Sequence, residues 1–295
     1  MTEMTCCVSC GGGTVAPDGH CWDCGTPQPA FRSHLELTAA GGAAGVSDRG
    51  LRRAVNADAM ALVRVGEWTV GVVCDGVSMS SRPERAAQVA ADTGAATTVA
   101  LLRAGALPET ALTEGTIRAA RAVTALAAPR MSPAPPGPPP DRRSPDQPAL
   151  GPSDKPGENP PACTYVAGIA SPDGVWTAWI GDSRAYWLPR EGTPMTLTED
   201  DTGTHDALSA WLGADAAGPD PHLRSYRPHT PGVLLLCTDG LWRHLPTPAA
   251  LRTRTTRGTD HLHTARALVT HALTAGGEDN ITALLLPAAP RSHPG

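Results

Sequence analysis

The segment Val233-Leu234-Leu235-Leu236-Cys237-Thr238-Asp239-Gly240 is an apolar run that ends in a carboxylate and a glycine. A short apolar run bounded by a turn signal is typical of a buried β-strand. The same pattern occurs in residues 68–76, which end in Cys74-Asp75-Gly76, and in reverse in residues 279–286, which begin with Asp279-Asn280. The sequence therefore predicts that three carboxylates, those of Asp75, Asp239 and Asp279, lie at the ends of buried strands.

The pattern of these carboxylates predicts a binding site for a divalent cation. Strand ends deliver side chains to the rim of a sheet, and a group of carboxylates with little Lys or Arg beside it suits a hard cation such as Mg²⁺ or Mn²⁺. Asp-Gly and Asp-Asn are also ordinary turn signals, so a turn explains any one of these pairs taken alone. Their recurrence on several predicted strands favours the metal site.

Five short motifs follow one another along the chain. They are Ser47-Asp48-Arg49-Gly50-Leu51-Arg52-Arg53-Ala54-Val55-Asn56-Ala57-Asp58, Cys74-Asp75-Gly76, Gly181-Asp182-Ser183-Arg184-Ala185-Tyr186, Leu236-Cys237-Thr238-Asp239-Gly240-Leu241-Trp242 and Gly277-Glu278-Asp279-Asn280-Ile281-Thr282. In this order they resemble the motifs of the type 2C metal-dependent protein phosphatases in their bacterial form. Each motif is weak alone, but five in the right order are specific, and the resemblance extends from about Leu35 to Pro287.

The resemblance implies both a fold and an activity. The fold is α+β, a four-layer αββα sandwich of two antiparallel sheets flanked by helices, with the metal site at one end. The activity is that of a metal-dependent protein serine/threonine phosphatase, which hydrolyses phosphoserine and phosphothreonine by attack of a water that bridges two Mn²⁺ or Mg²⁺ ions. The substrates implied are phosphorylated proteins, the products of a serine/threonine kinase.

The resemblance also implies roles for individual residues. Asp75 would bridge both ions, the Gly76 carbonyl would join one of them, and Asp239 and Asp279 would complete the shell of the other. Asp58 would serve the second ion, and Arg53 would bind the phosphoryl group with its planar guanidinium. Without the neighbouring motif, Arg53 would be interpreted as a solvated charge in an Arg-rich stretch.

Four positions depart from the family's pattern. Ala57 replaces an acidic or amide residue, and residues 77–80 offer no general acid, which leaves protonation of the leaving group to metal-bound water. Asn159 stands where a carboxylate for a third metal is expected, so two ions are predicted. Only six residues, 202–207, occupy the position of a mobile flap. These departures leave an alternative function open, that of a catalytically weak or inactive module that binds phosphoproteins.

The N-terminus carries a second predicted metal site. Cys7 and Cys10 form one Cys-x-x-Cys pair, Cys21 and Cys24 form another, and ten residues separate the two pairs. Paired thiolates at this spacing are typical of a structural zinc ribbon, in which the metal supplies folding free energy on the order of 10 kcal/mol. Cys6 could replace Cys7 as a ligand. Disulfides or a rubredoxin-type iron centre are the alternatives.

The chain is predicted to consist of a zinc ribbon in residues 1–26, a linker in residues 27–34 and a phosphatase domain in residues 35–290. The stretch from 129 to 161 contains thirteen prolines and almost no apolar bulk. Such a composition cannot offset the entropy of ordering, so we expect a disordered insertion, either a spacer or a ligand for a partner's aromatic groove.

Three helices are predicted from apolar periodicity and from end signals. They span about 83–103, with Ser80 and Ser81 as caps, about 108–127, and about 260–275. Asp182 and Arg184 are predicted to be structural residues of a strand turn, and His244 to be a surface or capping residue.

Composition excludes several classes of function. The net charge is −5 and no basic block occurs, which argues against nucleic acid as a partner. The longest apolar runs are far too short to span a membrane, and the N-terminus lacks a basic and then apolar signal region. We therefore expect a cytoplasmic monomer with no membrane partner.

Overall fold

The computed structural model describes residues 7, 9–11, 21, 23–24, 26, 33–127, 159–204, 207–255 and 260–291. Within these residues, two antiparallel sheets contain most of the strands. In spatial order, one sheet contains β1 (His34–Thr38), β2 (Ala44–Asp48), β13 (Ile281–Ala288), β12 (Gly232–Cys237), β8 (Arg184–Pro189) and β9 (Met195–Thr196). The other contains β11 (His222–Tyr226), β7 (Gly174–Ile180), β6 (Tyr165–Ser171), β4 (Trp68–Asp75) and β3 (Asp58–Val65). A separate short pair joins β10 (Leu212–Gly213) to β5 (Ala162–Cys163).

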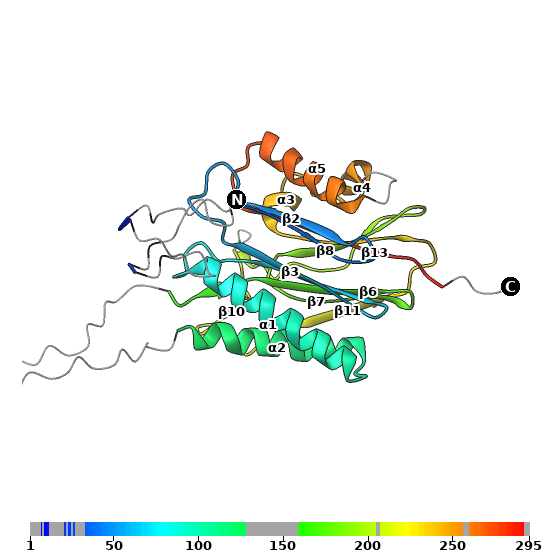
Figure 1. Ribbon diagram of the computed structural model, residues 1–295, viewed down its shortest axis with the longest axis horizontal. Coiled ribbons are helices and arrows are strands. Elements are labelled where there is room, and N and C mark those ends of the chain that lie inside the picture. The colour runs from blue at the N-terminus through cyan, green and yellow to red at the C-terminus, as the bar shows by residue number, and fades with distance from the viewer. Residues whose placement is uncertain are drawn as a thin grey trace, which may run out of the picture.

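Helices cover the outer face of each sheet (Figure 1). The long helices α1 (Pro83–Arg103) and α2 (Pro108–Ala125) lie on the five-stranded sheet, and α3 (Asp239–Trp242), α4 (Pro248–Arg254) and α5 (His261–Thr274) lie on the six-stranded sheet. The layers are therefore helix, sheet, sheet, helix, and the predicted αββα sandwich is confirmed.

The two sheets pack closely because glycines of one face leucines of the other. A Cβ atom added at Gly71 would lie 2.8 Å from a Leu284 methyl group, and one added at Gly168 would lie 2.7 Å from a Leu234 methyl group. Apolar side chains of both inner faces, including Val73, fill the rest of the layer. Strands buried on both sides read as continuous apolar runs, which is the pattern that predicted them.

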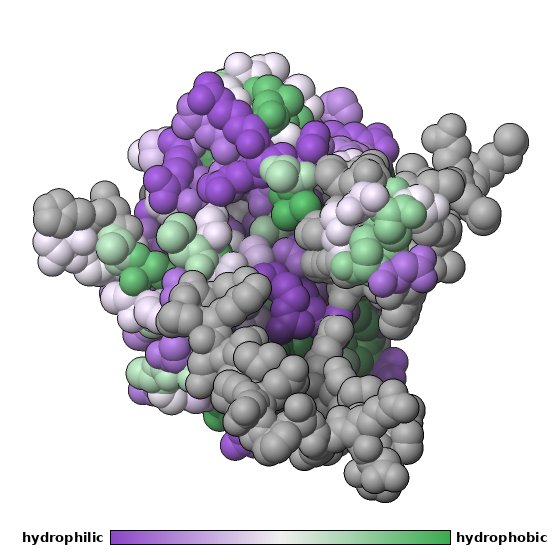
Figure 2. Space-filling view, turned by 90° about the vertical axis from the view of Figure 1, so that its left-hand side faces the viewer, coloured by the Kyte–Doolittle hydropathy of each residue, from purple (hydrophilic) through white to green (hydrophobic). Residues whose placement is uncertain are grey.

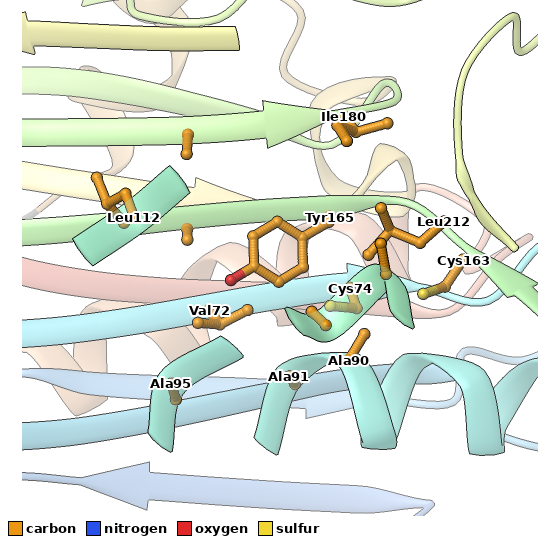
Figure 3. Packing of buried hydrophobic residues seen from close by; sticks show 14 of the residues in the cluster. Val72, Cys74, Ala90, Ala91, Ala95, Leu112, Cys163, Tyr165, Ile180 and Leu212 are labelled. Atoms are coloured by element: carbon orange, nitrogen blue, oxygen red, sulfur yellow. The ribbon is translucent and has the colours of Figure 1, made fainter. Parts of the chain in front are cut away.

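The layer under α1 is built from small helix residues around one aromatic ring (Figure 3). Tyr165 points from β6 toward α1, where Ala91 and Ala95 pack beside it, and Leu112 of α2 lies nearby. A Cβ atom added at Gly94 would lie 2.2 Å from the Tyr165 hydroxyl oxygen. The Ala-rich sequence of α1 therefore allows the helix to approach a sheet that carries a large side chain.

The predicted helices are present, but one predicted cap is wrong. The N-cap of α1 is Arg82 in a left-handed conformation (φ 50°), and no side chain caps the helix. The Ser80 hydroxyl instead donates to the Val77 carbonyl at 2.7 Å, and the Ser81 N–H donates to the Asn159 carbonyl at 2.9 Å. These bonds hold both serines in the preceding loop.

The N-terminal ribbon, the linker and the Pro-rich insertion lie largely outside the described residues. Cys6, residues 27–32 and residues 128–158 belong to these unplaced segments. The predicted domain boundaries therefore stay predictions. Within the helices that the structure describes, no segment is both long enough and apolar enough to span a membrane.

Candidate metal and phosphate site

The predicted acidic residues meet at one end of the sandwich. Asp75 ends β4, Asp239 begins α3 two residues after the end of β12, and Asp279 lies two residues before the start of β13. These three side chains line a single cavity of about 520 Å³, together with Arg53 and Gly76. Figure 2 shows this end of the molecule, where hydrophilic surface continues into the centre of the face. Strand ends thus bring together carboxylates that are far apart in the sequence.

Asp58 lies next to this group but does not line the cavity. It pairs with Asp75 across β3 and β4, and its side chain is buried. One carboxylate oxygen, Oδ2, accepts hydrogen bonds from the hydroxyls of Thr238 (2.9 Å) and Thr282 (2.7 Å). These threonines come from β12's end and from β13, so the Asp58 carboxylate joins the two sheets at this end.

Asn280 attaches the loop that carries Arg53 to the start of β13. Its side-chain oxygen accepts from the Ala57 N–H at 2.8 Å, and its side-chain nitrogen donates to the carbonyls of Arg49 (2.8 Å) and Val55 (2.9 Å). This one amide therefore fixes both ends of the loop around Arg53.

Two glycines permit close approach of the backbone around the cavity. A Cβ atom added at Gly240 would lie 1.9 Å from the Asn280 carbonyl oxygen, and one added at Gly50 would lie 2.1 Å from the Asp279 carbonyl oxygen. Gly50 also has φ +75°, a conformation that favours glycine. The first helix turn after β12 and the Arg53 loop can therefore both cross over the Asp279-Asn280 backbone.

Arg53 lies where a phosphate-binding group is expected. Its Nη2 donates to Asp279 Oδ2 at 2.6 Å, and its side chain is 38% exposed. Hydrogen bonding to Asp279 raises the pKa of Arg53 above its ordinary value, and the charges of Asp75 and Asp239 act in the same direction. The guanidinium is thus held inside the cavity and remains partly accessible from solvent.

The charge in the cavity lining is strongly unbalanced. Five carboxylates line it, those of Asp75, Asp182, Asp239, Glu278 and Asp279, against the two guanidinium groups of Arg53 and Arg243. Fully ionised, the lining would carry an excess of negative charge that repels a phosphate dianion. Burial raises the pKa of Asp75 well above its ordinary value, and the neighbouring carboxylates raise it further. The cluster therefore favours either protons or bound cations.

Divalent cations fit this set of residues. Two buried carboxylate oxygens, Asp58 Oδ1 and Asp239 Oδ1, have no hydrogen-bond partner in the described structure. Burial raises the pKa of Asp58 to about 8, and the charges of Asp239 and Asp279 contribute. Carboxylate oxygens at one cavity, partly unpartnered and short of positive charge, are the kind of ligand that Mg²⁺ and Mn²⁺ prefer.

Sequence reasoning gave no site role to several residues of the cavity lining, among them Asp182, Arg243 and His244. Asp182 follows β7, and burial together with the charge of Asp239 raises its pKa to about 6, so it is part of the acidic cluster as well as of a turn. Its position after an apolar strand was the available signal. His244 is half-buried in the cavity wall and is not a simple surface residue.

Arg184 has the structural environment predicted for it. Its Nε and Nη2 donate to the two oxygens of Asp200 at 2.8 and 2.7 Å, and its guanidinium carbon lies 3.6 Å from the centroid of the Trp242 ring. Trp242 in turn donates from Nε1 to the Asp182 carbonyl at 2.9 Å. This network fixes the turn that carries Asp182.

The positions that depart from the family's pattern also have clear places. Asn159 donates to the Met79 carbonyl at 3.1 Å on the surface and is not among the residues that line the cavity. The segment in the position of the flap is short, since Thr202 pairs with Leu208 and the Gly203 N–H donates to the Ala207 carbonyl. Leu208 lines the cavity, so this tight loop forms part of its wall.

The four predicted zinc ligands form a cluster. The Sγ atoms of Cys7, Cys10, Cys21 and Cys24 all lie within 4.8 Å of one another, with 3.6 Å between Cys7 and Cys24 and between Cys10 and Cys21. A tetrahedral zinc with Zn–S bonds of about 2.3 Å separates its sulfurs by about 3.8 Å, so the spacing fits. Hydrogen bonds, above all the one from the Cys10 N–H, lower the pKa of Cys7 to about 6. This lowered pKa favours the thiolate that zinc requires.

Comparison with known proteins gives one family and one fold. The family model described as Protein phosphatase 2C matches residues 50–275. The structure is similar to the PPM Ser-Thr phosphatase MsPP from Mycobacterium smegmatis in complex with cacodylate, with a TM-score of 0.60 and 23% identity over 84% of this chain and 98% of that one. It is also similar to PppA, a key regulatory component of the type VI secretion system (T6SS) in Pseudomonas aeruginosa, with a TM-score of 0.62 and 22% identity over 87% and 97% of the two chains.

A third similar structure is the serine/threonine phosphatase Stp1 from Staphylococcus aureus, with a TM-score of 0.63 and 19% identity over 88% of this chain and 98% of that one. No curated protein sequence matches the chain. At these identities, the likeness to solved structures concerns the fold.

Proposed function

Because the chain belongs to the protein phosphatase 2C family, we propose that it is a metal-dependent protein serine/threonine phosphatase that hydrolyses phosphoserine and phosphothreonine in phosphorylated proteins. The observation that carries this proposal is the meeting of Asp75, Asp239, Asp279 and Arg53 in one cavity. In a site that had lost its function, drift would be expected to replace at least one of these four residues.

Two Mn²⁺ or Mg²⁺ ions are proposed to be held by Asp75, Asp239, Asp279 and the Gly76 carbonyl. Asp58, buried opposite Asp75 on the neighbouring strand, would support these ligands. When bound, the ions supply an activated water and neutralise charge on the phosphoryl oxygens. The protein itself positions the substrate. Arg53, held by Asp279, would bind the phosphoryl oxygens, and the short loop that contains Leu208 would bound the cavity.

The N-terminal cysteines support a structural zinc site as a second proposal. Their proposed role is to stabilise a ribbon in residues 1–26. None of the four cysteines is among the residues that line the acidic cavity. The ribbon and the Pro-rich stretch would then select partners, while the acidic cavity performs hydrolysis. The substrates would be phosphoproteins produced by a serine/threonine kinase.

Release of phosphate from a phosphothreonine peptide in the presence of Mn²⁺ tests the main proposal. We expect turnover that disappears with EDTA and in Asp239→Asn, whereas Asp220→Asn, which changes an exposed carboxylate outside the cavity lining, retains it. Circular dichroism checks that Asp239→Asn is folded. Absence of turnover in folded, Mn²⁺-loaded wild-type protein would reject the enzyme and leave the phosphoprotein-binding module.

A further inference from the structure

The cavity contains a second guanidinium group, that of Arg243, in addition to Arg53. Arg243 directly follows the single turn of α3, and its N–H donates to the Asp239 carbonyl at 3.0 Å. Its Nε donates to Asp239 Oδ2 at 2.9 Å, in a pair spaced four residues apart. The backbone turn and the side-chain contact thus hold Arg243 at the edge of the acidic cluster.

The outer part of this guanidinium is available to a ligand. The side chain is 58% exposed, and its two terminal nitrogens have no partner among the residues that the structure describes. On one side, the guanidinium carbon lies 5.3 Å from the centroid of the Trp242 ring. Because Arg184 and the Asp182 carbonyl fix that ring, the ring in turn limits where Arg243 can point.

Arg243 and Arg53 have the same relation to the acidic cluster. Each donates from one nitrogen to one oxygen of a cluster carboxylate, Arg53 to Asp279 and Arg243 to Asp239. Each has further N–H groups besides this bond, and both residues line the shared cavity. A phosphoryl group has three non-bridging oxygens, more than one guanidinium fork can bind.

We propose that Arg243 is a second phosphate-binding residue, which together with Arg53 binds the phosphoryl oxygens of the substrate. This inference rests on the proposed phosphatase function and adds a residue to its substrate site. The different environments of the two Asp239 carboxylate oxygens support this inference. Oδ2 orients Arg243, while the buried Oδ1 has no hydrogen-bond partner among the described residues and stays available to a cation.

The competing interpretation is that Arg243 acts as an internal cation that displaces a metal ion from Asp239. The two interpretations predict opposite results for the variant Arg243→Ala. Loss of a phosphate ligand weakens binding of phosphate and leaves Mn²⁺ affinity intact. Loss of a competing cation strengthens binding of Mn²⁺ and leaves phosphate affinity intact.

Isothermal titration calorimetry on the full chain separates these results without turnover. Inorganic phosphate is titrated into Mn²⁺-loaded wild type, Arg243→Ala, Arg243→Lys and Arg121→Ala, and Mn²⁺ alone is titrated into each metal-free protein. Arg121 is exposed on α2, away from the cavity, and controls for loss of one positive charge. Steady-state kinetics with a phosphothreonine peptide follow on the same four proteins.

We expect Arg243→Ala to weaken phosphate binding by roughly tenfold or more, as loss of a charge-assisted hydrogen bond does. The same variant should raise KM for the peptide, Arg243→Lys should restore part of the affinity, and Arg121→Ala should match wild type. Unchanged phosphate affinity in Arg243→Ala overturns the inference, whether or not Mn²⁺ binds more tightly.

The two proposals fail in different ways. If wild type binds phosphate through Arg243 but does not hydrolyse the peptide, the enzyme proposal fails and the second phosphate ligand stands. If wild type hydrolyses the peptide and Arg243→Ala does so with unchanged KM and phosphate affinity, only the inference about Arg243 fails.

Discussion

The Asn280 side chain forms hydrogen bonds to three separate backbone groups near the cavity, and we propose no catalytic role for it. In Asn280→Ala the Ala57 N–H and the carbonyls of Arg49 and Val55 would lose their partners. Leaving one buried and two partly buried polar groups unpaired is costly, so we expect a loss of roughly 2–4 kcal/mol in the free energy of unfolding. Urea denaturation measures it, and phosphatase activity should fall as well because the Arg53 loop is released.

The control for this variant is Asn159→Ala, which removes a single surface hydrogen bond to Met79. Its effect should lie within roughly 0.5 kcal/mol. Similar losses in the two variants would mean that the loop is held by contacts other than the Asn280 side chain.

Gly240 is a position where one added carbon atom should be strongly destabilising. Its Cβ would lie 1.9 Å from the Asn280 carbonyl oxygen, a backbone atom that cannot move without shifting β13. We expect Gly240→Ala to lower the free energy of unfolding by about 2 kcal/mol or more. Gly218→Ala, where nothing lies within 4 Å of the added carbon, serves as the control and should be close to neutral. A stable Gly240→Ala protein would contradict the close crossing.

The residues of the cavity differ in how far the sequence could predict them. Asp75, Asp239 and Asp279 were predictable because each adjoins an apolar strand, and strand ends share a rim. Arg243 was not predictable, because its contact with Asp239 depends on a helical turn that begins at Asp239. The residues that follow an Asp-Gly pair could equally form a loop. Asp182 adjoins a strand as well, but its turn motif was interpreted as structural.

At the scale of elements, the predicted strands and helices lie within a few residues of their observed bounds. Helix α1 begins at Pro83, as predicted, because proline is favoured in the first helical turn. The predicted serine caps were wrong because Ser80 bonds back to Val77 in its own loop and Ser81 bonds to the distant Asn159, a contact that leaves no local signal. Local chemistry thus indicates where an element begins more reliably than what holds its end.

An ion pair joins strand β1 to helix α5 and makes stability depend on pH. Arg266 donates to both oxygens of Glu36 at 2.7 Å, and this contact, followed by His34, lowers the pKa of Glu36 to about 2. A lowered carboxylate pKa stabilises the folded state above the ordinary value near 4.5 and loses that effect as pH falls toward 2. Glu36→Gln should therefore have a lower Tm than wild type at pH 7.

The difference in Tm between wild type and Glu36→Gln should shrink as pH is lowered from about 4.5 toward 2. Thermal unfolding followed by circular dichroism across this range checks it, with Glu191→Gln, which changes an exposed loop residue, as the control. A difference that stays constant with pH would show that the effect comes from packing and not from the charge of Glu36.

At the scale of the whole molecule, the resemblance predicted the layers, whereas the local sequence pattern did not predict which strands pair when they are far apart in the chain. Strand β13 lies between β2 and β12, and its register joins Ile281 to Asp48. A pairing between such distant segments is decided by the fit of whole faces, such as leucines against Gly71 and Gly168, and not by a local motif.

The cysteine cluster leads to a prediction about metal content. Purified wild type should contain about one zinc per chain by elemental analysis, as a single four-thiolate site requires. Cys10→Ser should lose most of this zinc, because three thiolates bind it less strongly. Cys163→Ala, which changes a buried cysteine of the sandwich core, should keep it. Zinc retained by Cys10→Ser and lost by Cys163→Ala would place the ion elsewhere.

The central position of β13 has a consequence for protein synthesis. Its partners β2 and β12 emerge from the ribosome before it. Although β2 can pair with β1 and β12 with β8, the two halves of the sheet are joined only once residues 281–288 have been translated. Asp279 and the Asn280 amide that holds the Arg53 loop arrive at the same late moment. A nascent or prematurely terminated chain is therefore expected to lack a complete cavity, so that the proposed phosphatase activity would begin only after residues 279–288 have been translated.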